Sequence, residues 1–496
     1  MRVTAIAACA ASCLLFAATH ESHAQRRAPR ELVQRALEAL GGESAARGVN
    51  NLTFDYVSVT YQLGQEETPQ SPPRGTVFTG RIVSDFAGSR RLQEQEVRPG
   101  APAPAGSPAV TVTRQRRITL QSGGMLETNA QQGPEPALQI PASQQALRLI
   151  PHRILLAALD RPAAVTAIAP RAFRGDTLDG VRYAGADTVA LYFDRLSGSL
   201  VILETIADDP VLGDRRRATI FTRWTPSGAI MFPRQIDVEV NGRTAEHMNV
   251  VAATTNDALT DAMFAIPDSI TARARASTGP APIAVTLVDL GSGVWRADGG
   301  SHHTLVVEQP NGLILVETPQ NRARMSAVFD TLRSRFPNKA VLEAVNTHHH
   351  WDHSGGLRET MARGVAIVTH VRNVSFVRGV ALAPKTVAPD NLSRVRRMPA
   401  VRGVRDSLTI GTGAGRVVVY ALPTAHAEGM LAAYVPSVGV LFTSDVLSPG
   451  APNAPLAAPG SRELDTFAKA RGITPRRYAG GHGRIADWSE VQRAAQ

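Results

Sequence analysis

Cysteine and lysine are nearly absent from this chain of 496 residues. The two cysteines, Cys9 and Cys13, both lie within the first 24 residues. If that segment is removed, the mature protein has no disulfide bond and no thiol nucleophile. The cationic residues are almost all arginine, because the lysines are limited to Lys339, Lys385 and Lys469. Cysteine-dependent catalysis is therefore excluded for the mature chain.

Aromatic residues are also scarce, at 5% of the chain. The arginine clusters, such as RQRR at 114–117 and RRR at 215–217, have no aromatic residues between them. Nucleic-acid binding is not expected, because it usually combines a basic patch with aromatic stacking. The net charge of +10 is more typical of a solvated surface, which an anionic envelope surface could attract at low salt.

The chain begins with a long hydrophobic run, residues 3–18, directly after Arg2. The run is too short and too rich in small residues for a good membrane anchor. Residues 22–24, Ser-His-Ala, end in the small side chains that a signal peptidase accepts. We expect residues 1–24 to be a signal peptide that is cleaved after Ala24, which predicts a periplasmic or secreted protein. The alternative is a retained N-terminal anchor.

Residues 25–270 are predicted to form a mainly antiparallel β domain with a few helices. Segments such as LTFDYVSVTYQL (52–63) and GTVFTGRIVSDF (75–86) alternate apolar and polar side chains, as half-buried strands do. Asn241-Gly242 indicates a tight hairpin turn. No nucleotide-binding loop, metal-ligand spacing or nucleophile motif occurs in this half of the sequence.

Three segments of this half carry a resemblance to a known family: YFDRLSGSLVILET (192–205), GAIMFPRQIDVEVNGR (228–243) and FAIP (264–267). They resemble the half-barrel of periplasmic lipoprotein carriers and outer-membrane lipoprotein-sorting proteins. The resemblance implies a concave apolar face that holds an acyl chain, and association with a membrane or lipid. The alternative is a structural or dimerising sheet, which is compatible with a homo-oligomer.

A small, polar segment rich in Pro and Gly, residues 271–283, is predicted to link two domains. In residues 284–496, an antiparallel start is followed by strands that alternate with helices. This order predicts an α/β domain with two sheets that are covered by helices.

The stretch VNTHHHWDHSGG, residues 345–356, follows a valine-rich strand. His348 and His350 are two residues apart, so their side chains leave the strand on the same face, and His349 points the other way. Asp352 and His353 lie in the turn that follows. Burying these groups without partners would cost a few kcal/mol each, and a metal ion with N and O ligands, zinc above all, removes that cost. The alternative is a polar surface loop.

Three further donors stand at strand ends beside small residues: His426 in LPTAHAEGM, Asp445 in LFTSDVL and His482 in YAGGHGR. Each alone is more typical of an ordinary loop residue. Together they raise the number of candidate ligands to seven, which suits two metal ions better than one.

This ordered set resembles the metallo-β-lactamase superfamily over residues 284–496. The resemblance implies an αββα sandwich with the site at one edge of the two sheets. It also implies a ligand set for two zinc ions: His348, His350 and His426 for the first, Asp352, His353 and His482 for the second, and Asp445 bridging both.

The same resemblance implies an exported binuclear zinc hydrolase, in which a metal-bridging hydroxide attacks the carbonyl of a small ester, thioester or lactone. Asp352 is the expected catalytic residue, which passes a proton to the leaving group. The aspartate at 445 favours this branch, since zinc β-lactamases usually carry cysteine or serine there. The alternatives are a periplasmic zinc β-lactamase and a lipid- or lipoprotein-binding protein with a secondary metal domain. Iron or manganese are alternatives to zinc, and the sequence leaves the substrate open.

Overall fold

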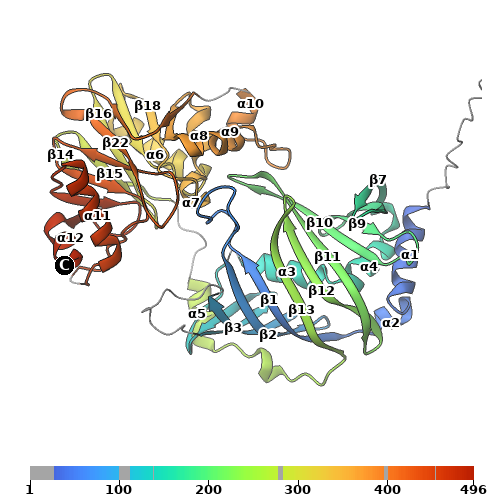
Figure 1. The fold of residues 1–496 in the computed structure, drawn as a ribbon. Helices are drawn as coiled ribbons and strands as arrows, with labels where there is room; N and C mark the ends of the chain where they lie inside the picture. Colours follow the sequence, from blue (N-terminus) through green and yellow to red (C-terminus); the bar gives the residue numbers. More distant parts are fainter. Residues whose placement is uncertain (1–26, 100–111, 138, 277–282, 396–399, 453) are drawn as a thin grey trace, which may run out of the picture.

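The structure is a computed structural model that describes residues 27–99, 112–137, 139–276, 283–395, 400–452 and 454–496. It consists of two domains that lie side by side (Figure 1). The predicted signal peptide, residues 1–24, lies outside the described residues and stays a prediction. Within the described ranges, no helix is both long enough and apolar enough to cross a membrane.

The N-terminal domain is built on one antiparallel sheet of thirteen strands. Two meanders, β1 to β6 and β7 to β13, join through the antiparallel pair of β1 and β13. The period-two pattern decides which side chains face inward, because Leu52, Phe54 and Tyr56 of β1 are buried while Val57 is exposed. The strands are β1 (Asn51–Tyr61), β2 (Gly75–Asp85), β3 (Arg90–Pro99), β4 (Thr113–Leu120), β5 (Gly123–Thr128), β6 (Gln131–Pro134), β7 (Val165–Phe173), β8 (Asp176–Ala184), β9 (Thr188–Phe193), β10 (Leu200–Asp209), β11 (Gly213–Ser227), β12 (Ile230–Val240) and β13 (Arg243–Thr255).

Helices cover part of this sheet, which curves around α3 and α4 (Figure 1). The proline at 151 separates these two helices, as its fixed backbone angle predicts. Buried residues of α1 and α4 form one core with β8, β9 and β10. The helices are α1 (Pro29–Ala39), α2 (Glu43–Arg47), α3 (Ile140–Arg148), α4 (Pro151–Asp160) and α5 (Asp268–Ala276), with short 3-10 turns η1 (Pro162–Ala164) and η2 (Asp261–Phe264).

The predicted linker, residues 271–283, begins too early. Residues 271–276 continue helix α5, which packs against β5 and β6 of the N-terminal sheet. Ile270 anchors the helix, because its side chain is buried with Met125 and Phe264. Small, polar residues indicated a linker, but they are also compatible with an exposed helix. Such a helix is stable when one of its apolar side chains, here Ile270, packs against the rest of the domain. The remaining candidate linker residues, 277–282, lie outside the described residues.

The C-terminal domain has the predicted αββα layers. Its first sheet contains β14 (Thr286–Gly291), β15 (Val294–Asp298), β16 (Thr304–Gln309), β17 (Gly312–Val316), β18 (Ala340–Val345), β19 (Ala366–His370) and β20 (Val401–Val404). Its second sheet contains β21 (Ser407–Ile410), β22 (Val417–Leu422), β23 (Met430–Val435), β24 (Val440–Thr443), β25 (Arg477–Gly480) and β26 (Ala486–Asp487). The helices are α6 (Arg322–Arg335), α7 (Trp351–Ser354), α8 (Leu357–Ala362), α9 (Val374–Leu382), α10 (Asn391–Val395), α11 (Ala458–Arg471) and α12 (Trp488–Ala495), with 3-10 turns η3 (Val371–Asn373) and η4 (Gly413–Gly415).

Three apolar layers hold this domain together. Residues from both sheets, such as Val316, Val345 and Phe442, form the layer between the sheets. A second layer joins the first sheet to α6, α8 and α9, and a third joins the second sheet to α11 and α12. Because β17 to β20 run parallel, as do β24 and β25, the carboxyl ends of several strands meet at one edge of the domain.

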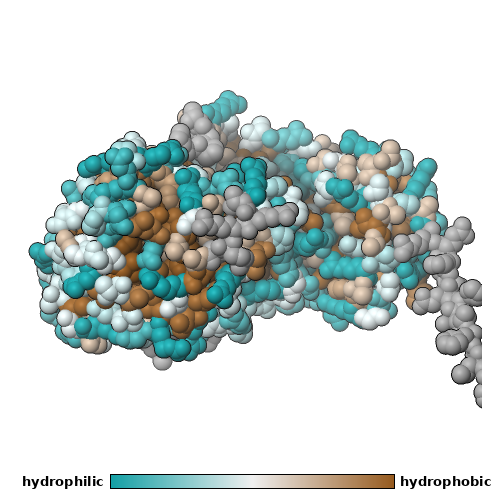
Figure 2. Space-filling model, turned by 90° about the horizontal axis from the view of Figure 1, so that it is seen from above, coloured by the Kyte–Doolittle hydropathy of each residue, from teal (hydrophilic) through white to brown (hydrophobic). Residues whose placement is uncertain are grey.

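The outer surface of the two domains is mixed in character. Figure 2 shows hydrophilic and apolar residues intermingled over the face seen from above. Large apolar side chains that are strongly exposed include Leu196 and Leu382, at 90% and 66% exposure. These two residues belong to different domains and are far apart in the sequence.

The two domains are joined at the turn between β10 and β11. Val211 of this turn is buried in the core of the C-terminal domain. The buried carboxylate of Asp214 accepts hydrogen bonds from the backbone N–H of Thr386 at 2.8 Å and of Val387 at 3.1 Å. It also accepts one from Oγ1 of Thr386 at 2.5 Å. Asp214 thus caps a loop of the other domain.

We expect Asp214→Ala to lower the free energy of unfolding by about 2–3 kcal/mol, because it leaves three donors of the docked loop without their acceptor. Urea denaturation monitored by fluorescence measures this change. Asp176→Ala, at an exposed position of β8, is the matched control and should be close to neutral. Equal stability of the two variants would contradict the assigned docking role.

Candidate metal centre

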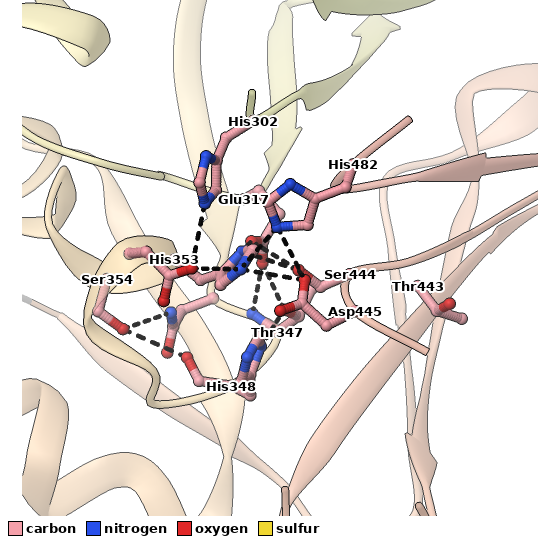
Figure 3. A network of polar contacts seen from close by, with 12 residues as sticks. His302, Glu317, Thr347, His348, His353, Ser354, Thr443, Ser444, Asp445 and His482 are labelled. Carbon is pink, nitrogen blue, oxygen red and sulfur yellow. Dashed lines mark hydrogen bonds and ion pairs between the residues drawn. The ribbon is translucent and has the colours of Figure 1, made fainter. Parts of the chain in front are cut away.

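Loops at the carboxyl ends of four strands bring the predicted ligands to one edge of the two sheets. His348 and His350 follow β18, His426 follows β22, Asp445 follows β24 and His482 follows β25. Figure 3 shows His348, His353, Asp445 and His482 pointing toward one another. Short helix α7, which begins directly after His350, carries Asp352 and His353. All seven residues predicted from the sequence therefore lie together.

A first group of potential ligands consists of His348, His350, His426 and Asp445, whose donor atoms lie within 4.8 Å of one another. The imidazole ring of His348 lies 4.5 Å from that of His350 and 5.1 Å from that of His426, between ring centroids. His350 and His426 are 4.6 Å apart. The three rings thus surround one small volume.

One nitrogen of each of these rings is buried without a hydrogen-bond partner among the described residues: Nε2 of His348, Nδ1 of His350 and Nε2 of His426. Such an arrangement is costly in a folded protein, because a buried polar atom normally finds a partner. A cation supplies one partner to all three nitrogens at once, and three imidazoles with a carboxylate are ligands that zinc accepts. The donor set therefore fits a metal ion.

A second group consists of His302, Asp352, His353 and His482, also within 4.8 Å. Nε2 of His353 lies 3.3 Å from Oδ2 of Asp352 and 3.4 Å from Nε2 of His482. His302, which the sequence prediction missed, places Nε2 at 3.2 Å from Oδ2 of Asp352. The pair His302-His303 before β16 is a possible signal in the sequence, but nothing there indicates which chain segment it faces.

Asp445 lies between the two groups. Its Oδ2 is 3.4 Å from Nε2 of His426, in the first group. Its Oδ1 is 3.0 Å from Nε2 of His353 and 3.3 Å from Nε2 of His482, in the second. One carboxylate thus presents a different oxygen to each group, which is the geometry that the predicted bridging role requires.

The protonation of the two groups differs. Burial lowers the pKa of His348 and His350, and it lowers the pKa of His426 to about 4. In the second group, burial opposes the charge of His353, but Glu317, Asp352 and Asp445 outweigh it and raise its pKa well above the usual range. The hydrogen bond to Asp445 raises the pKa of His482. The histidines of the second group therefore hold a proton more readily than those of the first.

Glu317, at the end of β17, is a second residue that sequence reasoning missed. Its buried carboxylate contacts Nδ1 of His353 at 2.5 Å and accepts hydrogen bonds from Thr347 and from Oγ of Ser444, the latter at 3.1 Å. Its backbone φ of 82° is strained for a residue with a side chain. Glu317 fixes the ring of His353 so that Nε2 faces Asp445.

The two glycines after the histidine stretch are needed for close packing. A Cβ atom at Gly355 would lie 1.9 Å from the carbonyl oxygen of Gln320, and one at Gly356 would lie 2.2 Å from Met325. His349, which the sequence excluded from the ligands, is buried and belongs to neither group of four. The turn that carries the ligands is thus held directly against the loop after β17.

Comparison with known proteins agrees with this architecture. Residues 297–482 match the family model of the metallo-beta-lactamase superfamily. A curated relative, the 2,4-dinitroanisole O-demethylase subunit alpha of Nocardioides sp., is 29% identical over 160 residues. The match covers 32% of this chain and 44% of the relative, so less than half of the relative's length is represented here.

Similar solved structures include a metallo-beta-lactamase from Pontibacter korlensis, with 17% identity and a TM-score of 0.34, covering 42% of this chain and 96% of that one. Another, from Hirschia baltica, has 20% identity and a TM-score of 0.32, with coverage of 42% and 96%. The family match identifies the C-terminal region as a domain of the metallo-β-lactamase superfamily, with the fold of its metal-dependent hydrolases.

We expect acid to release a cation from the second group before the first. A cation must displace protons from His353 and His482, whose pKa values are raised, but not from the three histidines whose pKa values are lowered. As the pH is lowered, occupancy of the second group should therefore fall at a higher pH than occupancy of the first. Metal analysis after dialysis at each pH measures this, and parallel loss from both groups would contradict it.

Proposed function

We propose that this protein is a binuclear zinc hydrolase that acts on the carbonyl of a small ester, thioester or lactone. The observation that carries the proposal is the pair of four-ligand groups that Asp445 joins, together with the unpartnered imidazole nitrogens of the first group. His348, His350 and His426 would hold one cation. Asp352, His353 and His482 would hold the other, with His302 beside them.

Bound cations at this site would supply an acidified water molecule as nucleophile and an electrophilic contact for the substrate oxygen. The protein's own groups divide the remaining work. Asp352 is ionised at neutral pH, because its hydrogen bonds with His302 and His353 outweigh burial and lower its pKa. It is 37% exposed on its side chain whereas Asp445 is 15% exposed, so Asp352 is the carboxylate that reaches a bound substrate. We assign it the acceptance of a proton from the attacking water and the transfer of that proton to the leaving group.

Export belongs to the same proposal. The chain segment expected to direct it, residues 1–24, would be removed after Ala24. A periplasmic or secreted hydrolase without cysteine in its mature chain would keep its activity in an oxidising compartment.

The test is a metal analysis combined with a substrate panel and Asp445→Ala. We expect about two zinc ions per wild-type chain, and turnover of acyl esters, thioesters or lactones. Asp445→Ala should lose metal and at least about 100-fold in activity, since this carboxylate faces both groups. Asp330→Ala, on the exposed face of α6, is the control.

The panel includes nitrocefin and 2,4-dinitroanisole, the latter because the curated relative is named as an O-demethylase of that compound. If nitrocefin were the one panel compound turned over, the proposed substrate class would change from an ester, thioester or lactone to a β-lactam. If Asp445→Ala kept both metals and full turnover, the proposed role of this residue would be wrong.

A second candidate function concerns the N-terminal domain, for which we propose the binding of an amphipathic anion with an acyl chain. A cavity of about 600 Å³ lies between the sheet and helices α3 and α4. Its lining is largely apolar and includes Phe54, Phe221, Phe232 and Met248. This volume lies in the range of small-ligand pockets.

Arginines give this cavity its charge. Arg91, Arg215 and Arg217 line it. Arg215 lies 4.0 Å from a carboxylate oxygen of Asp209, whereas Arg91 and Arg217 form no ion pair with a carboxylate of the described residues. Burial lowers the pKa of Arg91 to about 10 and also lowers that of Arg217. Glu246 is the acidic residue of the lining, and burial raises its pKa. Two poorly solvated cations beside an apolar wall favour a carboxylate with a hydrocarbon tail.

Laurate binding, measured by calorimetry, tests this second candidate. Arg217→Gln should weaken the affinity about tenfold through loss of a charge-assisted contact. Arg216→Gln is the control, because the neighbouring side chain on β11 points to the opposite face. Dodecanol that binds as tightly as laurate would contradict the role of the arginines, and a protein that binds neither would contradict the candidate function.

A further inference from the structure

A segment of the N-terminal domain reaches the candidate metal centre. Residues 62–74 connect β1 to β2 and extend beyond the sheet toward α7 (Figure 1). Residues 64–67 of this connection, called here the clamp, contact the chain on both sides of the site. The backbone N–H of Trp351 donates to the carbonyl of Gly64 at 3.1 Å. The N–H of Glu428, two residues after His426, donates to the carbonyl of Glu67 at 2.8 Å.

The clamp also contacts the ligands themselves. The side-chain amide of Gln65 donates to Oδ1 of Asp352 at 2.7 Å. The backbone carbonyl of Glu66 accepts from Nε2 of His350 at 2.9 Å and from Nε2 of His349 at 2.9 Å. Each group of four ligands thus has one member that is hydrogen-bonded to the other domain.

The contact with Glu66 determines which nitrogen of His350 is free. When Nε2 carries the hydrogen and donates it to the carbonyl, Nδ1 keeps its lone pair. This Nδ1 is one of the three buried nitrogens without a partner. A second hydrogen bond of this kind is how proteins orient metal-binding histidines and fix their tautomer.

The clamp is itself firmly held. The carboxylate of Glu66 is almost fully buried, at 1% exposure, and accepts from the N–H of Gly64 at 2.8 Å and from Arg243 of β13. Gly64 has a φ of 85°, and a Cβ atom there would lie 2.1 Å from the indole of Trp351. An accidental domain contact would not require a glycine, a buried carboxylate and a matching arginine in one short segment.

We propose that the clamp is a positioning element of the metal centre, through which the N-terminal domain sets metal affinity and ligand geometry in the C-terminal domain. Gln65 holds Asp352 in place, and the carbonyl of Glu66 holds the ring of His350. The inference rests on the proposed metal-dependent function. It adds that the N-terminal domain contributes to that function. It makes Gln65 a positioning residue, since it acts through Asp352.

Two substitutions of Gln65 separate hydrogen bonding from packing. Gln65→Ala removes the donor, and Gln65→Glu keeps the size but replaces the donor with a carboxylate that repels Asp352. Both should lower metal affinity about 10- to 100-fold, as losses of groups that orient ligands do. Gln62→Ala, at an exposed position just before the clamp, should leave metal affinity unchanged.

The readouts are metal affinity by chelator competition and the visible absorption spectrum of the cobalt-substituted protein, alongside kcat and KM. A merely structural role would change the melting temperature but not the cobalt spectrum of the protein that stays folded. We expect both Gln65 variants to change the cobalt spectrum. They should lower kcat by a larger factor than the factor by which KM changes.

Gly64→Ala tests the backbone contact, because the new methyl group displaces the clamp from Trp351. Gly242→Ala is its control: Gly242 has a similar φ of 79° but has no atom within 4 Å of the added Cβ. Both substitutions introduce the same backbone strain, and only the first should weaken metal binding.

The outcomes distinguish this inference from the proposed function. If the protein binds metal and the two Gln65 variants and Gly64→Ala all match wild type in affinity and spectrum, the clamp has no positioning role. If the Gln65 and Gly64 variants lose affinity while no panel substrate is turned over, the clamp stands and the proposed reaction fails. A protein that binds no metal overturns both.

Discussion

The cost of burying imidazole groups without hydrogen-bond partners is the constraint on which the C-terminal domain depends. His348 and His350 follow a strand that ends in the buried residues Ala344 and Val345, and both side chains are almost fully buried. The side chain of His426 is 28% exposed, but its Nε2 atom is buried. The sandwich could have avoided this cost with apolar side chains at the same positions. It instead directs three nitrogens without hydrogen-bond partners at one point, an arrangement that a cation placed there would stabilise. The apolar layers between and outside the two sheets contribute the folding free energy that offsets the cost of this arrangement.

Carboxylates gather at the same edge of the domain, and either protons or a cation can balance their charge. Asp352 and Asp445 carry negative charge into it, and Glu317 adds a third carboxylate from behind. The neighbouring carboxylates raise the pKa values of His353 and His482, so these two rings accept a proton most readily. Protons on these two rings and a metal ion are thus alternative ways to neutralise one cluster. The strained backbone at Glu317 fits this view, because it places a carboxylate against the ring of His353, which needs a fixed orientation.

The sequence was sufficient to predict two kinds of feature: patterns that repeat along the chain, and side chains that follow a strand. Period-two segments predicted the antiparallel N-terminal domain, and the alternation of strands and helices predicted the αββα layers, which the family match confirms for the C-terminal region. Five of the seven candidate ligands follow a strand, and Asp352 and His353 lie in the turn after His350. Strand ends that meet at one edge of the domain could therefore be expected to bring them together. His302 and Glu317 were missed because their roles arise from contacts across the sheet. The linker was placed too early because α5 has only one strongly buried side chain to reveal it.

The contacts between the two domains could not be predicted, because no pattern along the sequence indicates them. Gln65 and Glu66 lie in a polar connection between two strands, and its composition resembles that of any exposed loop. Asp352 is 287 positions further along the sequence. The two domains meet at this clamp and again where Asp214 caps residues 386–387, and two separate contacts fix an orientation that one contact would leave free to rotate. The contact at Asp214 therefore does more than join the domains. By preventing rotation, it keeps the carbonyl oxygen of Glu66 in one domain at hydrogen-bond distance from His350 in the other.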